Sequence, residues 1–429
     1  MGVLARKDRE MTPKTPRDAP AFVHRASMRR RCATALALAT TAIGGLATAP
    51  PASALTASLA RLPIRTGPIG LFTGLQGGKA PSHRQLRRIA HSSSVVIVTP
   101  AGAVTFGPRL KAANPAIVLL VYENGGYSVP TDPSGMPESW FLHDASGNRI
   151  QSAANPQNEL MNPRSTAAFR PGGVTYRGWA DYVTRVCRRD QTRLTSGCFL
   201  DALGPGPLHK PRNLHGGVPI DPKSGAPFTY RSYMTMQANY AAHVQARIRR
   251  TLVANAFSSG NAYFTRSTRL IDRVGNVAGE AEVWMIAGTW QQNVQMLIDN
   301  ARSGSGCLVN FNAKPTRLKH QRQYITASFL IGRGKHQYLQ FSDPAHKSFE
   351  ELSPLYKMRI GRPLRHHARL GRYFHHGVYR RRFRNGIAVA NPGSHAVKFR
   401  LGGRYKNVSG RLMTSVTLAP RSGIVLVRA

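Results

Sequence analysis

Short apolar runs alternate with helical patterns through most of the chain. The runs predict buried strands at residues 69–73, 95–99, 117–122, 198–201, 252–257, 277–285, 307–311 and 337–341. Apolar residues at helical spacing predict helices at 82–90, 179–188, 230–250, 291–301 and 325–332. Because strands that alternate with helices pair in parallel, about eight such units predict an α/β fold, a (β/α)₈ TIM barrel.

The pattern changes after about Leu355. An Arg/His-rich stretch at 359–384 gives way to period-two alternation, which predicts short strands at 377–383, 386–391, 396–401, 411–416 and 422–427. Turn sequences such as Asn385-Gly386 separate these strands. We therefore expect a barrel domain at 55–355, and an Arg/His-rich connection with a small all-β sandwich domain at 356–429.

The first 54 residues resemble a targeting segment. Arg29-Arg30-Arg31 precedes an apolar run at 33–47, and Ala52-Ser53-Ala54 follows as a small-residue cleavage site. We expect a signal peptide with an upstream leader, cleaved after about Ala54, and a secreted or cell-envelope-associated protein without a transmembrane span in its mature chain. The run is short for a membrane span, although an uncleaved anchor is the alternative, and translation could start at Met1 or Met28.

The chain is strongly basic. It has 60 Lys and Arg against 19 Asp and Glu among 429 residues, a net charge of +41. Residues 1–54 hold nine basic and three acidic residues, so 55–429 keep +35. Such an excess predicts attraction to a polyanion, such as an acidic polysaccharide, an anionic cell envelope or nucleic acid, with general basicity that serves no particular partner as the alternative. We expect no nucleic-acid partner, because no nucleic-acid-binding motif is recognised, and we expect a monomer.

Three cysteines follow the targeting segment. Cys187 and Cys198 are 11 residues apart, at the end of one predicted helix and the start of the next strand, so a disulfide between them is plausible in an exported protein. No cysteine or histidine group has metal-ligand spacing, and no nucleotide- or dinucleotide-binding motif occurs. We expect neither a metal nor a cofactor.

The sixteen carboxylates of residues 55–429 can be sorted by position. Five lie on predicted strands or near their ends: Glu123, Asp201, Glu280, Glu282 and Asp343. Glycoside cleavage requires two carboxyl groups that flank one bond. Asp201 ends the fourth strand, and Glu280 and Glu282 are two residues apart on the sixth, so that both face the same way.

We therefore expect Asp201 to be the nucleophile or base. Glu282 lies nearer the strand end and is the expected general acid, with Glu280 as the alternative. A structural ion pair with arginines is the competing interpretation of the two glutamates.

Aromatic and polar residues near the ends of successive strands are expected to line the cleft and bind substrate, although each one alone is more typical of a structural residue. They are Tyr122, Glu123, Asn124, Trp140, Asn255, Trp284, Asn310 and Tyr338, with Asn312 and Lys314 as further candidates.

A family resemblance covers about residues 66–429. The sequences Trp140-Phe141-Leu142-His143-Asp144, Met161-Asn162-Pro163 and Gly197-Cys198-Phe199-Leu200-Asp201 resemble hypothetical glycosyl hydrolase family 15. Residues 377–386 and Asn391-Pro392 resemble the β-domain that follows the barrel in such enzymes. The resemblance implies a barrel with a C-terminal β-sandwich and hydrolysis of an α-linked or unassigned polysaccharide. It places the acids at Asp201 and Glu282, although Gly-Glu-Ala-Glu stands where one acid is expected.

The sequence thus predicts a secreted glycoside hydrolase that cleaves a polysaccharide with two carboxylates. The alternative is a non-catalytic, strongly basic protein that binds the cell envelope or another polyanion on a degenerate barrel.

Overall fold

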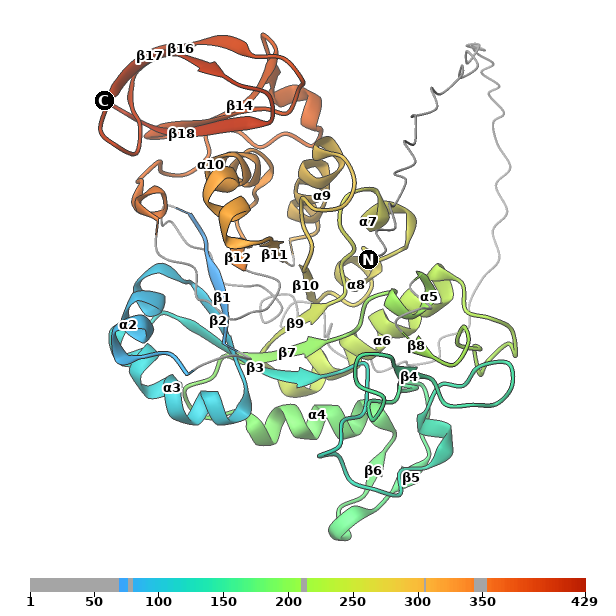
Figure 1. Ribbon diagram of the computed structural model, residues 1–429. Coiled ribbons are helices and arrows are strands. Elements are labelled where there is room, and N and C mark those ends of the chain that lie inside the picture. The colour runs from blue at the N-terminus through green and yellow to red at the C-terminus, as the bar shows by residue number, and fades with distance from the viewer. Residues whose placement is uncertain (1–68, 76–79, 210–213, 305, 343–352) are drawn as a thin grey trace, which may run out of the picture. The chain divides into compact units, whose positions relative to one another are not determined.

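The computed structural model describes residues 69–75, 80–209, 214–304, 306–342 and 353–429. The expected signal peptide, Met28 and Asp343 lie outside these residues. Helices and strands alternate over the first part of the described chain, and strands alone follow near its end (Figure 1).

Eight parallel strands form the barrel. Its sheet has the order β1 (Phe72–Leu75), β2 (Val95–Val98), β3 (Val118–Asn124), β7 (Gly197–Asp201), β9 (Thr251–Asn255), β10 (Ala278–Ala281), β11 (Cys307–Asn312) and β12 (Gln337–Ser342). Leu71 bridges Leu339 in parallel, and the Leu339 amide donates to the Gly70 carbonyl at 2.9 Å, so the last strand returns to the first. The predicted barrel is confirmed.

Helices follow the barrel strands along the chain. The longer ones are α2 (His83–Ser92), α3 (Pro100–Ala113), α4 (Trp179–Asp190), α6 (Tyr230–Ile248), α9 (Trp290–Ser303) and α10 (Pro315–Gly332), and α5 (Gly206–His209), α7 (Asn261–Thr265) and α8 (Leu270–Arg273) are short. Ser82 begins α2 with a capping box that includes Gln85. The sequence pattern missed α3, where three of the four buried residues are the small Gly102, Ala103 and Gly107 and only Leu110 is large.

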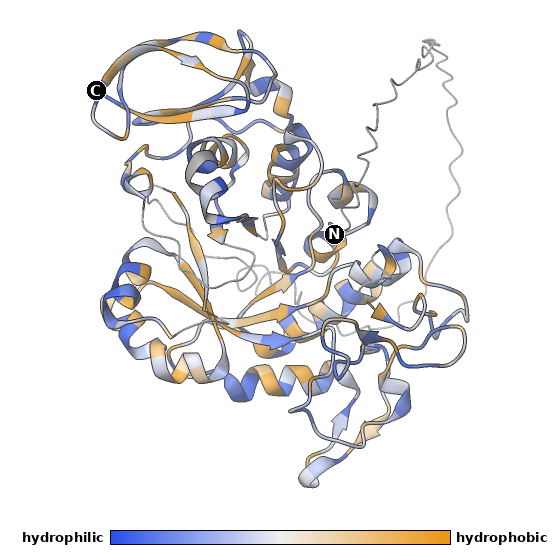
Figure 2. Cartoon of the chain, in the orientation of Figure 1, coloured by the Kyte–Doolittle hydropathy of each residue, from blue (hydrophilic) through white to orange (hydrophobic). Residues whose placement is uncertain are grey.

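Strand alternation fills the barrel with apolar side chains. Phe72, Ile97, Leu120, Phe199 and Val253 belong to one buried cluster, each from a different strand. The strands carry most of the apolar colour in the barrel (Figure 2). Side chains two residues apart on a strand share a face. On several strands the residue two positions after these apolar residues therefore also points inward, and it lies at the C-terminal end of the barrel.

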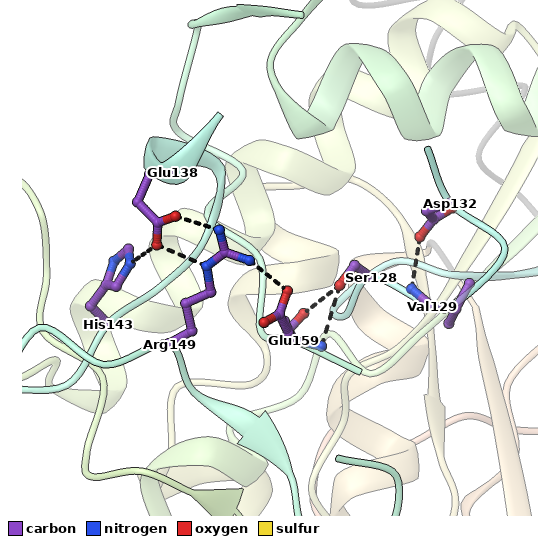
Figure 3. Close-up of polar contacts among 7 residues, drawn as sticks. All are labelled: Ser128, Val129, Asp132, Glu138, His143, Arg149 and Glu159. Atoms are coloured by element: carbon purple, nitrogen blue, oxygen red, sulfur yellow. Dashed lines mark hydrogen bonds and ion pairs between the residues drawn. The ribbon is translucent and has the colours of Figure 1, made fainter. Parts of the chain in front are cut away.

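A long segment connects β3 to α4. It contains η1 (Glu138–Trp140), η2 (Pro171–Gly173), β4 (Gln151–Ser152), β5 (Ala168–Phe169) and β6 (Tyr176–Arg177), and β4 pairs with β8 (Leu214–His215). Ion pairs cross its turns (Figure 3). Glu138 accepts from His143 at 2.6 Å and from the Arg149 Nε at 2.8 Å, and Arg149 also reaches Glu159 at 3.0 Å. These contacts hold the segment between β3 and α4 in a defined path.

Six antiparallel strands form the C-terminal sheet. Their order is β13 (Phe374–His375), β14 (Val378–Phe383), β15 (Gly386–Asn391), β18 (Ser422–Arg428), β16 (Val397–Lys406) and β17 (Leu412–Leu418), preceded by η4 (Pro354–Lys357) and η5 (Leu370–Tyr373). The sheet encloses its own apolar cluster, which includes Ile387, Phe399 and Leu426. This confirms the predicted all-β C-terminal domain, while its boundary at 355/356 stays a prediction.

Arg381 joins the C-terminal sheet to the barrel domain. Helix α10 packs against β15 and β18. Arg381 is 2% exposed, and its guanidinium donates to the carbonyls of Leu330, Ile331 and Arg333 at the end of α10 and to that of Arg365. A guanidinium at a helix C-terminus satisfies carbonyls that have no partner within the helix.

Candidate active site

The backbone around Asp201 is held by the loop that follows β3. The amides of Gly125 and Gly126 both donate to the Asp201 carbonyl, at 3.0 and 3.1 Å. A Cβ on Gly126 would lie 2.2 Å from the Ala202 carbonyl oxygen, so only glycine fits this approach. Ala202 itself has φ of 62°, a left-handed conformation that costs a residue with a side chain about 1–2 kcal/mol. The end of β7 is thus tightly specified.

The Asp201 carboxylate accepts three hydrogen bonds. The Tyr122 hydroxyl donates to Oδ2 at 2.6 Å, while the Asn255 amide and the Ala202 N–H donate to Oδ1 at 2.8 and 2.7 Å. Burial, followed by the charge of Asp201, raises the pKa of Tyr122, so this phenol stays protonated and remains a donor. Three donors orient the side chain and suit an ionised carboxylate.

Asn255 brings the two expected acids together. Its Nδ2 donates to the Asp201 Oδ1 at 2.8 Å and to the Glu282 Oε2 at 3.4 Å. The three residues come from consecutive strands, because Asp201 ends β7, Asn255 ends β9 and Glu282 directly follows β10. Parallel strands in one barrel end at the same face, which is where barrel enzymes hold their active sites.

These residues line a cavity of about 320 Å³. Polar side chains reach it from six neighbouring strands, with apolar residues beneath them: its lining is Phe72, Gly74, Ile97, Tyr122, Phe199, Asp201, Asn255, Glu280, Glu282, Asn310 and Gln340. A second cavity, of about 610 Å³, shares Asn255 and Glu282 with the first and also includes Ser258 and Arg266. Glu282 therefore stands where two cavities meet.

Glu280 and Glu282 differ in burial. Glu280 lies within β10 and is 6% exposed, whereas Glu282 follows the strand and is partly exposed. Burial, followed by the nearby charges of Glu282 and Asp201, raises the pKa of Glu280 well above its ordinary value. Burial and these charges therefore favour the protonated form of Glu280 in the lining of the cavity. No ion pair of either glutamate with an arginine is found in the described residues.

The expectation that three aromatic residues line the cleft is not met. Trp140 and Trp284 are fully buried in the main core, and their indole N–H groups donate to the carbonyls of Ala167 and Asn293. Tyr338 is 1% exposed and belongs to the apolar cluster inside the barrel. A buried indole whose N–H finds a carbonyl satisfies both its apolar and its polar atoms, so a structural role explains these residues.

Glu123 and Asn124 also lie outside the cavity lining. Glu123 alternates with Tyr122 and shares a hydrogen bond with Asp190, and burial, followed by the charge of Asp190, raises its pKa to about 8. Asn124 accepts from the Tyr127 amide at 3.0 Å and so stabilises the turn after β3. The further candidates Asn312 and Lys314 do not line the cavity either.

Sequence reasoning missed Gln340 and Gly74. Gln340 lies two residues after Tyr338 on β12, and it pairs in register with Asn310, which was predicted. A count of alternate positions along each strand would have found it. Cys187 and Cys198 form a disulfide with a Cα–Cα distance of 6.0 Å, which ties α4 to β7, the strand that carries Asp201.

A closed parallel barrel with polar side chains gathered at the ends of its strands defines a class of enzymes with their active sites at that face. The model of "Hypothetical glycosyl hydrolase family 15" matches residues 111–387, and the chain belongs to this family. Membership of this family supports a glycoside hydrolase, which implies a carbohydrate substrate. No curated protein sequence is detectably similar to it.

Solved structures of glycoside hydrolases are distantly similar in shape. An Anoxybacillus α-amylase aligns over 84% of this chain and 98% of its own, at 10% identity and a TM-score of 0.45. A Geobacillus thermoleovorans α-amylase complexed with acarbose aligns over 85% and 99%, at 8% identity and a TM-score of 0.44. A family 30 subfamily 8 xylanase from Clostridium acetobutylicum aligns over 86% and 97%, at 12% identity and a TM-score of 0.42. The barrel assignment rests on the closed eight-stranded sheet.

Proposed function

We propose that this protein hydrolyses a polysaccharide with Asp201 and Glu282 as its two catalytic carboxylates. The observation that carries the proposal is the Asn255 amide, which contacts both carboxylates within the cavity at the ends of the barrel strands. Two carboxyl groups on either side of one glycosidic bond are the requirement of this chemistry.

The contacts suggest a role for each acid. Asp201 accepts three hydrogen bonds and is held rigidly, as a nucleophile should be. Glu282 is partly exposed between two cavities, where it can protonate the oxygen of a sugar that leaves on one side while the other sugar stays beside Asp201. Cavities on both sides of Glu282 also favour a polymer over a single sugar as substrate.

The spacing of the acids favours retention of configuration. The nearest oxygens of Asp201 and Glu282 are no further apart than the sum of 2.8 and 3.4 Å. A carboxyl separation of about 5–5.5 Å, as in retaining enzymes, fits within this limit. Proton NMR of the first product should show the anomer of the substrate, and the opposite anomer would exclude a glycosyl-Asp201 intermediate.

Release of reducing ends from a panel of cell-envelope and plant polysaccharides tests the proposal. We expect release by the native chain and a loss of about three to five orders of magnitude with Asp201→Asn. Asp299→Asn is the matched control, because it removes the same charge on α9, where Asp299 pairs with Arg273 outside the cavity. Equal activity of Asp201→Asn and the control would contradict the proposal, and no release by the native chain would favour a non-catalytic binding protein.

We also propose that the mature chain is exported after cleavage near Ala54. The Arg29–Arg31 cluster, the apolar run and the small-residue site support this. None of the helices in the described ranges is long and apolar enough to cross a membrane. N-terminal sequencing of protein recovered from the culture medium should begin at about Leu55, and recovery with an intact first 54 residues would contradict cleavage.

A further inference from the structure

The C-terminal part of the chain has cations without anions. Residues 352–429 contain 17 Lys and Arg and no Asp or Glu. All ion pairs found in the described residues lie between Glu138 and Asp299, in the barrel domain. The side-chain cations of the C-terminal sheet therefore have no carboxylate side chain of their own domain to pair with, so a side-chain anion that pairs with them has to come from outside residues 352–429.

Several of these cations line one cavity. It has a volume of about 580 Å³ and lies among η5, β13 and β14, with Arg365, His367, Arg372, His375, Arg380 and Arg382 in its lining. Arg365, Arg372 and Arg382 are exposed, and Arg380 is partly buried. A concave surface lined by one sign of charge concentrates its potential on whatever enters.

The histidines of this cavity report the positive potential. Burial, followed by Arg372 and Arg365, lowers the pKa of His367. Burial, followed by Arg380, lowers the pKa of His375 in the same way. A cation near an imidazole disfavours its protonated form, so both shifts agree with a cavity whose positive charge is uncompensated.

Arg381 adds a buried donor at the same place. Its side chain also lines the cavity and is 2% exposed, and its Nη2 has no hydrogen-bond partner among the described residues. Its other nitrogens donate to backbone carbonyls, so no carboxylate offsets its charge. Buried donors are normally satisfied, and an orphaned one beside a cationic cavity points to a missing acceptor.

We propose that this cavity binds the anionic groups of an acidic polysaccharide. Guanidinium groups recognise carboxylate, sulfate and phosphate oxygens with paired hydrogen bonds. Phe374 is 50% exposed in the same lining, and its ring offers an apolar face on which a sugar ring can pack. The choice of a polysaccharide over a nucleic acid rests on the proposed function of the barrel, whereas the anion site itself does not.

Binding of the full chain to soluble polysaccharides tests this site. The probes are polygalacturonate and dextran sulfate, with neutral dextran as the uncharged control and a DNA duplex as competitor. All measurements use the Asp201→Asn background, so that loss of binding cannot be confused with hydrolysis of the probe. The binding result can therefore be interpreted even if the hydrolase proposal fails. We expect binding to at least one acidic polysaccharide, none to dextran, and a steep fall with salt.

Two quadruple variants separate a site from diffuse charge. The cavity variant replaces Arg365, Arg372, Arg380 and Arg382 by Gln. The matched control makes the same change at exposed arginines on or directly next to the strands of this sheet and outside the cavity: Arg400, Arg404, Arg411 and Arg428. We expect the cavity variant to lose at least about tenfold in affinity and the control less than about threefold. If the cavity variant fails to fold, Arg365→Gln with Arg382→Gln, both exposed, replaces it.

Three results would overturn the proposal. Equal losses in the two variants would show that charge acts without a site. If the DNA duplex displaces a bound acidic polysaccharide at a lower concentration than either free acidic polysaccharide does, the cavity would be assigned to nucleic acid. Absence of binding to both acidic polysaccharides would exclude the proposed ligand class.

Discussion

The barrel domain and the C-terminal sheet use charge in opposite ways. The barrel domain holds the carboxylates, and it either pairs them with nearby cations, as in Glu138 with Arg149, or gathers them at the strand ends, as in Asp201 and Glu282. The C-terminal sheet has no carboxylate and leaves its arginines without ion pairs among the described residues. The comparison shows that overall basicity is a poor guide to the proposed catalytic site, which lies where the rare acids converge.

Their stability has correspondingly different sources. The sheet relies on an apolar cluster and on backbone hydrogen bonds, and the Nε and Nη1 of its deeply buried Arg381 donate to backbone carbonyls. The barrel has destabilising features at the C-terminal ends of its strands, where Glu280 is buried near two other acids and Ala202 has a left-handed conformation. Strain and like charges of this kind are typical of functional sites.

After the loss of activity expected for Asp201→Asn, the next largest loss is expected at one of the two neighbouring glutamates, and it distinguishes them. Glu282→Gln should lower activity by about three orders of magnitude, because the leaving oxygen loses its proton donor. Glu280→Gln should lower it by less than about tenfold, since burial and the nearby acids favour the neutral form of Glu280, whose shape glutamine keeps. Rates on one polysaccharide, with thermal midpoints for both variants, measure the contrast. The reverse ranking would make Glu280 the acid.

The next effect concerns the link between the two regions. Arg381→Met should lower the free energy of unfolding by about 2–4 kcal/mol, because several buried carbonyls lose their donor. Chemical denaturation measures this loss, and Arg382→Gln, which alters the next and exposed arginine, is the control. Indistinguishable stability of the two variants would refute the role given to Arg381.

A smaller effect tests the buried acid beside the site. The pKa of Glu123 rises from 4.5 to about 8, so between these values the folded chain keeps a proton that the unfolded chain has released. Stability therefore falls as pH rises through this window. Glu123→Gln should remove part of that fall. The difference in thermal midpoint between the variant and the native chain should therefore be about 2 °C or more in favour of the variant at pH 8, compared with the same difference at pH 5. Parallel pH profiles for both chains would contradict the burial of this carboxyl.

The smallest effect is expected in the exposed ion-pair cluster of Figure 3. Hydrogen bonds from Arg149 and then His143 lower the pKa of Glu138 to about 2. The stability that these hydrogen bonds contribute is thus present above about pH 4.5 and is lost as pH falls toward 2. Glu138→Gln should cost less than about 1 kcal/mol at neutral pH, because exposed pairs are screened by water and salt. A cost above 2 kcal/mol, or one that is independent of salt, would contradict this.

Strand periodicity explains why the barrel and half of its cavity could be predicted. Tyr122, Asp201, Asn255 and Asn310 occupy inward positions at the ends of apolar runs, and the structure brings them together. Periodicity alone could not show that β10 ends at Ala281, after which the chain turns and buries the Trp284 side chain in the main core. Residue type misled at Trp140 and Tyr338, because an aromatic ring that could stack on a sugar serves equally well in a core.

The division of labour between the two regions can be tested with two variants in two assays. Asp201→Asn should abolish hydrolysis and keep binding to acidic polysaccharide, while the cavity variant should lose that binding and keep hydrolysis of a short neutral oligosaccharide of the cleaved linkage. Loss of a single, different function in each variant is the result we predict. Hydrolysis that survives Asp201→Asn, or one variant that loses both functions while folded, would contradict this account.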